Sequence, residues 1–437
     1  MYPIIIALIT VVLLVLAILS GIHVAVALGI LSFLGVWAIK GDIFIALNLL
    51  GTTAYHTPME YVLSVVPMFI FLGLFGNMAG ASEDIYDSAN VLLARVRGGM
   101  GIATVGANAV FAAITGSSIA SAAVFSKISY PQMMRLGYDK KLAMGTVIGS
   151  SVLGMLIPPS GLMVIYGYLT EQAIGKLFIA GVFPGLILAG IYAIGIYMMV
   201  TIKPHLGGRL PDVKAMSFGK YFKVIFRPWL FVLMIFFVLG GIYQGWFTPT
   251  EAGAVGAFVA FMLCLFKRKM TLKSLWQLLL EAGITFGSLF VLFIGAQLYS
   301  RMLALSTLPM KTTEVIGSLA MPAWMVIVMF IVIYLVLGAL LDSVSILLIT
   351  TPIMFPIISS LGFDPIWYAV VAVVAIEIGL LTPPFGICVF TMKAALGDQV
   401  TVEEGFRGSV PFMVMMLIAL IIVCFIPSLS TWLPSHM

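Results

Sequence analysis

Two stretches of this 437-residue chain share the same pattern of proline, glycine and aspartate. Residues 131–161 read PQMMRLGYDKKLAMGTVIGSSVLGMLIPPSG, and residues 356–386 read PIISSLGFDPIWYAVVAVVAIEIGLLTPPFG. A constant shift of 225 positions aligns them without a gap. The aligned pairs include Pro131/Pro356, Gly137/Gly362, Asp139/Asp364, Gly154/Gly379, Pro158/Pro383, Pro159/Pro384 and Gly161/Gly386. We therefore predict two halves built on one plan.

The paired prolines carry the physical meaning of the repeat. Proline lacks a backbone donor and clashes with the carbonyl four residues earlier, so Pro-Pro inside an apolar run breaks a helix. In a bilayer, broken backbone is tolerated only where protein buries it or a wet cavity receives it. Two matching broken segments are the sequence pattern that indicates the binding site of a secondary transporter.

The composition is that of a membrane protein. Hydrophobic residues make up 62% of the chain and charged residues 9%, against roughly a quarter charged in soluble domains. The N-terminal 20 residues lack the pattern of a cleaved signal peptide, so we expect a retained membrane helix. The net charge of +5 comes from loops and predicts no nucleic-acid binding. Three scattered cysteines indicate no metal or redox role.

Loop charges predict how the chain crosses the bilayer. Lys and Arg gather in residues 203–227 and 267–273, which we place in the cytoplasm. Counting apolar spans from there makes two segments re-entrant hairpins, with tips at 116–118 and 342–345, that enter from opposite faces. The predicted fold is an all-α polytopic membrane protein with an inverted repeat, two re-entrant helical hairpins and two broken helices.

Five segments follow from this topology. We predict a scaffold part of the first repeat (1–97), its transport part with hairpin and broken helix (98–200), a cytoplasmic connector (201–227), a scaffold part of the second repeat (228–321) and its transport part (322–437). Within the scaffold we expect one span over 52–75, and we expect the last helix over 410–427.

Each hairpin tip ends an apolar run with small polar residues, and each broken helix offers free carbonyls before its break and free amides after it. Such groups suit Na⁺ and, beside it, a carboxylate. The first predicted Na⁺ cage contains Ser117, Ser118, Ser121, Gly154 and Pro158, and the second contains Asp342, Ser343, Ser345, Gly379 and Thr382. The predicted substrate-binding residues are Ser117, Ser118, Pro159, Ser160, Ser343 and Pro384.

A purely structural role would also account for several of these residues. Serine and glycine in membrane helices often serve only close packing. Asp342, which takes the place of Ser117 in the second repeat, could bind a cation or carry a proton. Glu377 is equally deep, and a hydrogen bond to backbone would account for it without a functional role.

Several strings resemble the large membrane subunit of tripartite ATP-independent periplasmic (TRAP) transporters. They are GSSIASAA at 116–123, GMLIPPSG at 154–161, LFIAGVFPG at 177–185, and LDSVSILLITTPIMFPI with GLLTPPFG in the second half. The resemblance implies a Na⁺-coupled importer of organic acids, such as C4-dicarboxylates or sialic acid, in a bacterial inner membrane. It also implies an elevator-type motion, a periplasmic substrate-binding protein and a small four-helix membrane subunit, which we expect to be a separate chain.

Three alternatives remain beside a Na⁺-coupled transporter subunit. They are a self-sufficient carboxylate transporter coupled to Na⁺ or H⁺, a channel, and an intramembrane enzyme. No HExxH, GxSxG, P-loop or Rossmann motif occurs in the sequence. We therefore predict that the protein is not an enzyme and that ions, rather than ATP hydrolysis in this chain, drive transport.

Overall fold

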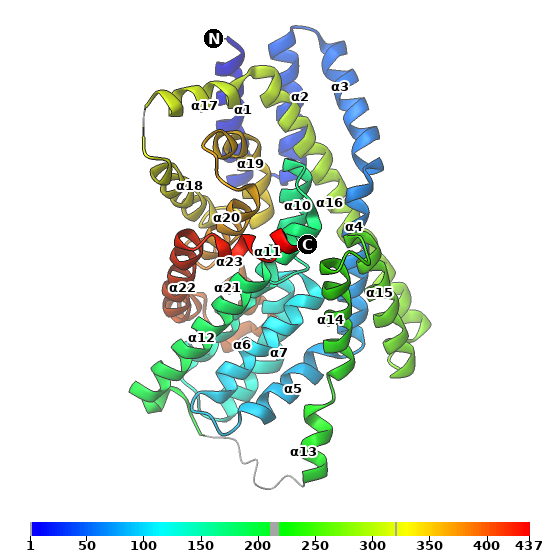
Figure 1. Ribbon diagram of the computed structural model, residues 1–437, viewed down its shortest axis with the longest axis vertical. Coiled ribbons are helices and arrows are strands. Elements are labelled where there is room, and N and C mark those ends of the chain that lie inside the picture. Colours follow the sequence, from blue (N-terminus) through cyan, green and yellow to red (C-terminus); the bar gives the residue numbers. More distant parts are fainter. Residues whose placement is uncertain (1, 210–217, 320) are drawn as a thin grey trace.

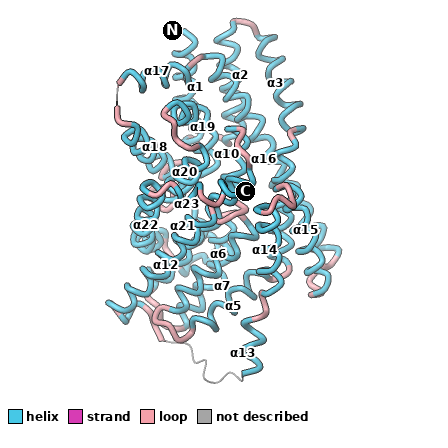
Figure 2. Tube along the Cα trace, viewed as in Figure 1, coloured by secondary structure: helices cyan, strands magenta, loops and turns pink. Residues whose placement is uncertain are grey.

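The computed structural model describes residues 2–209, 218–319 and 321–437, and its regular elements there are all helices (Figure 2). The first half contains α1 (Tyr2–Leu19), α2 (Val24–Lys40), α3 (Ile43–His56), α4 (Val65–Met78), α5 (Ala81–Leu93), α6 (Gly99–Thr115), α7 (Ser118–Arg135), α8 (Lys140–Ser151), α9 (Leu153–Leu156), α10 (Gly161–Thr170), α11 (Ile174–Ala180) and α12 (Val182–Ile202). The second half contains α13 (Phe218–Ile225), α14 (Trp229–Tyr243), α15 (Pro249–Phe266), α16 (Leu272–Ser306), α17 (Leu308–Ser318), α18 (Ala323–Gly338), α19 (Ser343–Ser360), α20 (Pro365–Gly379), α21 (Ile387–Leu396), α22 (Val402–Phe425) and α23 (Ser428–Thr431).

Length and composition confirm a polytopic membrane protein. Within the described ranges, nine helical segments are long and apolar enough to cross a bilayer. Part of the predicted connector, residues 210–217, lies outside the described residues.

Two predicted spans were wrong in detail. Residues 52–75 do not form one helix, because α3 ends at His56 and two 3₁₀ turns, the first containing Pro58, separate it from α4. The last helix begins at Val402 rather than near 410. Thr401 and Glu404 form a capping box there, which satisfies free amides of the first turn and extends the helix beyond its apolar run.

The scaffold helices pack as two equivalent pairs. The long helix α16 packs along α2, and α4 packs along α15. By position in the two halves, α2 corresponds to α15, and α3 with α4 corresponds to α16. Figure 1 shows α1 and α2 in the upper part of the molecule and α14 and α15 lower down. The predicted scaffold parts therefore contain the same kind of helix pair twice among the described helices.

The two hairpins lie toward opposite ends of the molecule. Helices α6 and α7 form the first hairpin in the lower half of Figure 1, and α18 and α19 form the second in the upper half. After each hairpin the local structure is the same. Gly137 and Gly362 have φ of 78° and 77°, and Asp139 and Asp364 each accept hydrogen bonds from the amides two and three residues later. The aligned aspartates are thus N-caps of the two broken helices.

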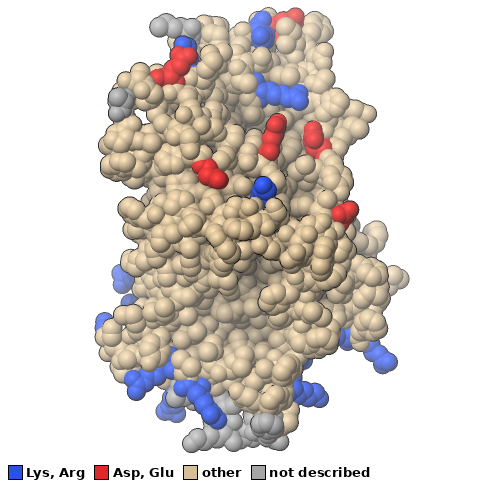
Figure 3. Space-filling view, viewed as in Figure 1, with Lys and Arg blue, Asp and Glu red and all other residues tan. Residues whose placement is uncertain are grey.

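Both predicted basic loops lie at one end of the molecule. The buried carboxylate of Asp84 in α5 binds Arg227 at 2.7 Å and Lys267 at 2.5 Å. Arg227 belongs to the predicted connector and Lys267 to the loop after α15. Figure 3 shows Lys and Arg gathered at the lower end of the visible face. This charge distribution agrees with the rule used to orient the chain.

Candidate functional site

The first hairpin tip is fitted against the first helix break, backbone to backbone. Gly161 N–H donates to Gly116 O at 3.4 Å. A Cβ on Gly154 would lie 2.7 Å from the backbone of Ser117, and one on Gly116, whose φ is +61°, would lie 2.3 Å from Pro159 O. Glycine is needed at both positions because any side chain would separate tip from break.

Serine hydroxyls cap the two helices that begin at this junction. Ser117 Oγ accepts from Ala120 N at 3.3 Å at the start of α7. Ser160 Oγ accepts from Met163 N at 3.4 Å at the start of α10 and donates to Met155 O before the break. The N-termini of α7 and α10 therefore meet at one place, where their partial positive charges add. The Pro158–Pro159 bond between the two parts of the broken helix is cis.

The second break also docks tightly on its hairpin, at the end of α18 a few residues before the tip. Phe385 N donates to Ala339 O at 3.2 Å, and a Cβ on Gly379 would lie 2.5 Å from the Cα of Gly338. Asp342 caps α19 by accepting from Ser345 N at 3.0 Å and from the Ser345 hydroxyl. Asp342 therefore occupies the capping position that Ser117 occupies in the first repeat.

A hydrogen bond joins the two repeats directly. Ser118 Oγ, in the first turn of α7, donates to Glu377 Oε2 in α20 at 2.7 Å. Both side chains are buried, and α9 packs against α20 beside them. The interpretation of Glu377 as bound to backbone was therefore wrong: its partner is a hydroxyl 259 positions away. Helix α9, which leads into the first break, thus packs against α20, which leads into the second.

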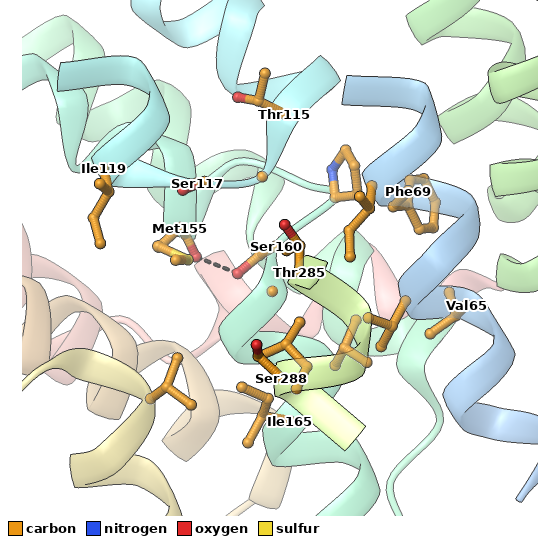
Figure 4. A pocket seen from close by; sticks show the side chains of 18 of the residues that line it. Val65, Phe69, Thr115, Ser117, Ile119, Met155, Ser160, Ile165, Thr285 and Ser288 are labelled. Carbon is orange, nitrogen blue, oxygen red and sulfur yellow. Dashed lines mark hydrogen bonds between the residues drawn. The ribbon is translucent and has the colours of Figure 1, made fainter. Parts of the chain in front are cut away.

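A cavity of about 530 Å³ separates this junction from the scaffold. Ser117 and Ser160 line one side, and Phe69 of α4 with Thr285 and Ser288 of α16 line the other. Figure 4 shows Ser160, Thr285 and Ser288 among the side chains that line the cavity. No charged side chain is among the lining residues that the structure describes, so polarity there comes from hydroxyls, carbonyls and helix termini.

The cavity includes part of the predicted substrate-binding set. Ser117, Pro159 and Ser160 line it. From the second tip, Val344 lines the cavity, whereas the predicted Ser343 next to it is not among the described lining residues. Ser118 lies behind the tip with Glu377, and Pro384 is exposed outside the cavity.

Contacts connect some members of each predicted Na⁺ cage, and the cages themselves stay a prediction. Tip and break approach each other at Ser117 and Gly154, and Asp342 binds Ser345. Ser121 Oγ is buried without a partner, whereas Thr382 Oγ1 donates to Ile378 O at 3.0 Å. No group of three or more His, Cys, Asp or Glu side chains suited to a metal occurs in the described residues. The available donors are hydroxyl, carbonyl and single carboxylate oxygens, which fit a hard monovalent cation.

The scaffold contribution was missed by sequence reasoning. Thr285 and Ser288 stand three residues apart and so share one face of the long helix α16. Two hydroxyls at helical spacing inside a long membrane helix were the available signal. Phe69 offered none, since an aromatic residue in an apolar helix is ordinary.

Comparison with known proteins identifies the family. The family model of the DctM component of tripartite ATP-independent periplasmic transporters matches residues 10–429. The chain belongs to this family. Its DctM relatives are transport proteins rather than enzymes. One, the C4-dicarboxylate TRAP transporter large permease protein DctM of Pseudomonas aeruginosa, is 36% identical over 387 residues, with 88% of this chain and 89% of the relative covered.

Other DctM relatives carry different substrate names. The sialic acid TRAP transporter large permease protein SiaM of Vibrio cholerae is 28% identical, with 86% of each chain covered. The isethionate TRAP transporter permease protein DctMQ of Oleidesulfovibrio alaskensis is 28% identical, and the match covers 94% of this chain but 63% of that longer protein.

Solved structures show the same fold at low identity. The Alcanivorax borkumensis YdaH transporter has a TM-score of 0.56 and 15% identity, with 89% and 88% of the two chains covered. Neisseria gonorrhoeae MtrF has a TM-score of 0.59 and 13% identity, with 98% and 95% covered. These membrane transporters support the predicted all-helical fold class and carry no information on the substrate of this DctM-family chain.

Proposed function

We propose that this chain is the translocation subunit of a Na⁺-coupled importer of small organic acids in a bacterial inner membrane. One observation carries the proposal: the N-termini of α7 and α10 meet at a cavity that contains hydroxyls but no charged lining residue among those described. Helix N-termini bind carboxylates and similar anions. The relatives are named for C4-dicarboxylates, sialic acid and isethionate, which are all small organic anions.

In this proposal the substrate anion binds between the first tip and the scaffold. Ser117, Ser160, Thr285 and Ser288 orient its oxygens. Na⁺ is held behind the tips, by Ser117, Ser118, Ser121, Gly154 and Pro158 in the first cage and by Asp342, Ser343, Ser345, Gly379 and Thr382 in the second. The cations offset the negative charge of the substrate in a low-dielectric interior, so anion and cation bind better together than alone.

The proposed transport step is an elevator-type movement. The predicted transport parts, residues 98–200 and 322–437, would slide as one body against the predicted scaffold parts, residues 1–97 and 228–321. The cavity lies on that boundary, since α4 and α16 line one side of it and the first tip and break line the other. We further propose a separate small four-helix subunit and a periplasmic substrate-binding protein as partners, as the family name implies.

Uptake into liposomes tests the proposed function. The full chain, with its small subunit, is reconstituted and given an imposed Na⁺ gradient, a panel of organic acids and the cognate binding protein. We expect saturable uptake of one acid class that requires both Na⁺ and the binding protein. Equal uptake without the binding protein would support a self-sufficient carboxylate transporter, and non-saturable flux would support a channel.

Variants of the cavity locate the substrate site. Ser160→Ala removes a cap and a hydroxyl beside the cavity, so we expect a higher KM for the acid. Ser126→Ala is the matched control, because the Ser126 hydroxyl is buried on α7 and donates to Ala122 O in its own helix. A KM unchanged by Ser160→Ala would remove this residue from the substrate site.

A further inference from the structure

The buried carboxyl group of Glu377 is only partly satisfied. Its side chain lies in α20, two residues before Gly379, and the residue is 1% exposed. Oε2 accepts the hydrogen bond from Ser118, whereas Oε1 is buried with no hydrogen-bond partner in the described part of the chain. A carboxylate in the membrane interior is costly unless it is paired, and its presence there indicates a functional role.

The two repeats differ in where they carry acidic residues. Val152 stands at the position aligned with Glu377, and Ser117 stands at the position aligned with Asp342. Residues 116–121 and 150–161, which form the first tip and break, contain no Asp or Glu. Any carboxylate at the first site must therefore come from elsewhere in the fold, and Glu377 of the second repeat reaches it through Ser118.

The direction of the hydrogen bond determines what Ser118 can still bind. A serine hydroxyl has one proton to donate and two lone pairs to accept with. Because Ser118 gives its proton to Glu377, its lone pairs stay free to face a cation. Ser121 Oγ, one turn along the same helix, is fully buried and also has no partner among the described residues.

We propose that Glu377 is a positioning residue for the first cation site, supplied by the opposite repeat. It orients the Ser118 hydroxyl so that the oxygen faces the cation, and its negative charge stabilises the bound cation. Groups behind a ligand commonly act in this way. The inference rests on the proposed Na⁺ coupling and deepens it. Because Glu377 lies in α20, a cation in the first cage would also stabilise the end of that helix, beside Gly379 of the second cage.

The test measures Na⁺ binding through stability. Thermal unfolding of the full chain in lipid nanodiscs is followed as Na⁺ replaces choline at constant ionic strength. Four forms are compared with wild type: Glu377→Gln, Ser118→Ala, the double variant, and Ser126→Ala as the control hydroxyl on α7. Gln keeps the shape of Glu377 and removes its charge.

We expect Glu377→Gln to raise the Na⁺ concentration at half-maximal stabilisation roughly tenfold or more. Without Na⁺ the variant should be as stable as wild type or more stable, because an unpaired buried charge has been removed. Ser118→Ala should have a similar effect, and the double variant should be little worse than either single one, since the two residues act as a unit. Ser126→Ala should leave the Na⁺ midpoint unchanged.

Three results would contradict the proposal, and they separate a failure of the Na⁺ coupling from a failure of the role of Glu377. If Na⁺ does not stabilise wild type at all, the proposed Na⁺ coupling is wrong and this inference fails with it. If Na⁺ stabilises wild type but Glu377→Gln keeps the same midpoint, the role of Glu377 alone is wrong. A loss of stability in Na⁺-free buffer with an unchanged midpoint would likewise assign Glu377 to structure.

Discussion

The break in the first half and the break in the second half share their backbone geometry but differ in burial and charge. In both, a glycine presses against a hairpin backbone, and a tip carbonyl binds an amide just beyond the prolines. Pro158 and Pro159 are buried, whereas Pro383 and Pro384 are exposed in the isolated chain. The second half also supplies both carboxylates, Asp342 and Glu377.

This difference shows how a repeated sequence produces an asymmetric site. Backbone docking depends on glycine and proline, and the two halves preserve it. Burial and charge depend on side chains other than the aligned proline, glycine and aspartate pairs, and these side chains differ between the halves. The cavity at the first tip is lined by both halves, because α4 belongs to the first half and α16 to the second.

The largest expected contrast concerns burial around the two breaks. Phe178, which lines the cavity beside the first break, is fully buried and packs edge-on against Phe69 at 5.4 Å between ring centroids. Phe178→Ala should cost about 3–5 kcal/mol in the free energy of unfolding. Phe385 at the second break is 49% exposed, so Phe385→Ala should cost less than about 1 kcal/mol. Thermal unfolding of the full chain in nanodiscs measures both, and equal losses would refute the asymmetry.

The second comparison should show equal losses of stability in the two halves, because a glycine packs against hairpin backbone at both breaks. Gly154→Ala and Gly379→Ala each place a methyl group under 3 Å from hairpin backbone, which should cost about 1–3 kcal/mol in each half. Gly190→Ala is the matched control in α12, since an added Cβ there would meet no neighbouring group within 4 Å, and helix propensity should make it neutral or stabilising. Unfolding temperatures compare the three. A Gly154→Ala variant as stable as Gly190→Ala would show that the tip can separate from the break.

The smallest contrast concerns the two caps. Asp342 accepts from an amide at 3.0 Å and also from the Ser345 hydroxyl, whereas Ser117 accepts one amide at 3.3 Å. Removing a cap costs about 0.5–2 kcal/mol, and a carboxylate gains further from the helix dipole. In Na⁺-free buffer we expect the loss of unfolding free energy to lie near the upper end of this range for Asp342→Ala and near the lower end for Ser117→Ala. The reverse order in unfolding measurements would mean that the first tip depends on its cap more than the second.

Much of the fold followed from local patterns. The capping by Asp139 and Asp364, the positive φ of Gly137 and Gly362, and the helix ends at the tips all depend on neighbours within a few residues. Ser117, Pro159 and Ser160, three of the predicted substrate-binding residues, line the cavity. Thr285 and Ser288 did not enter the prediction, because a helix sequence does not tell which distant surface its polar face meets.

The amino-acid sequence by itself determined that this chain is an all-helical membrane protein with two matching breaks, because proline, glycine and capping residues act through the backbone next to them. Only the tertiary structure decided that the first break is buried, and that Glu377 crosses from one repeat to bind Ser118 in the other. Contacts between residues 259 positions apart depend on how whole helices pack, and no local pattern records that packing.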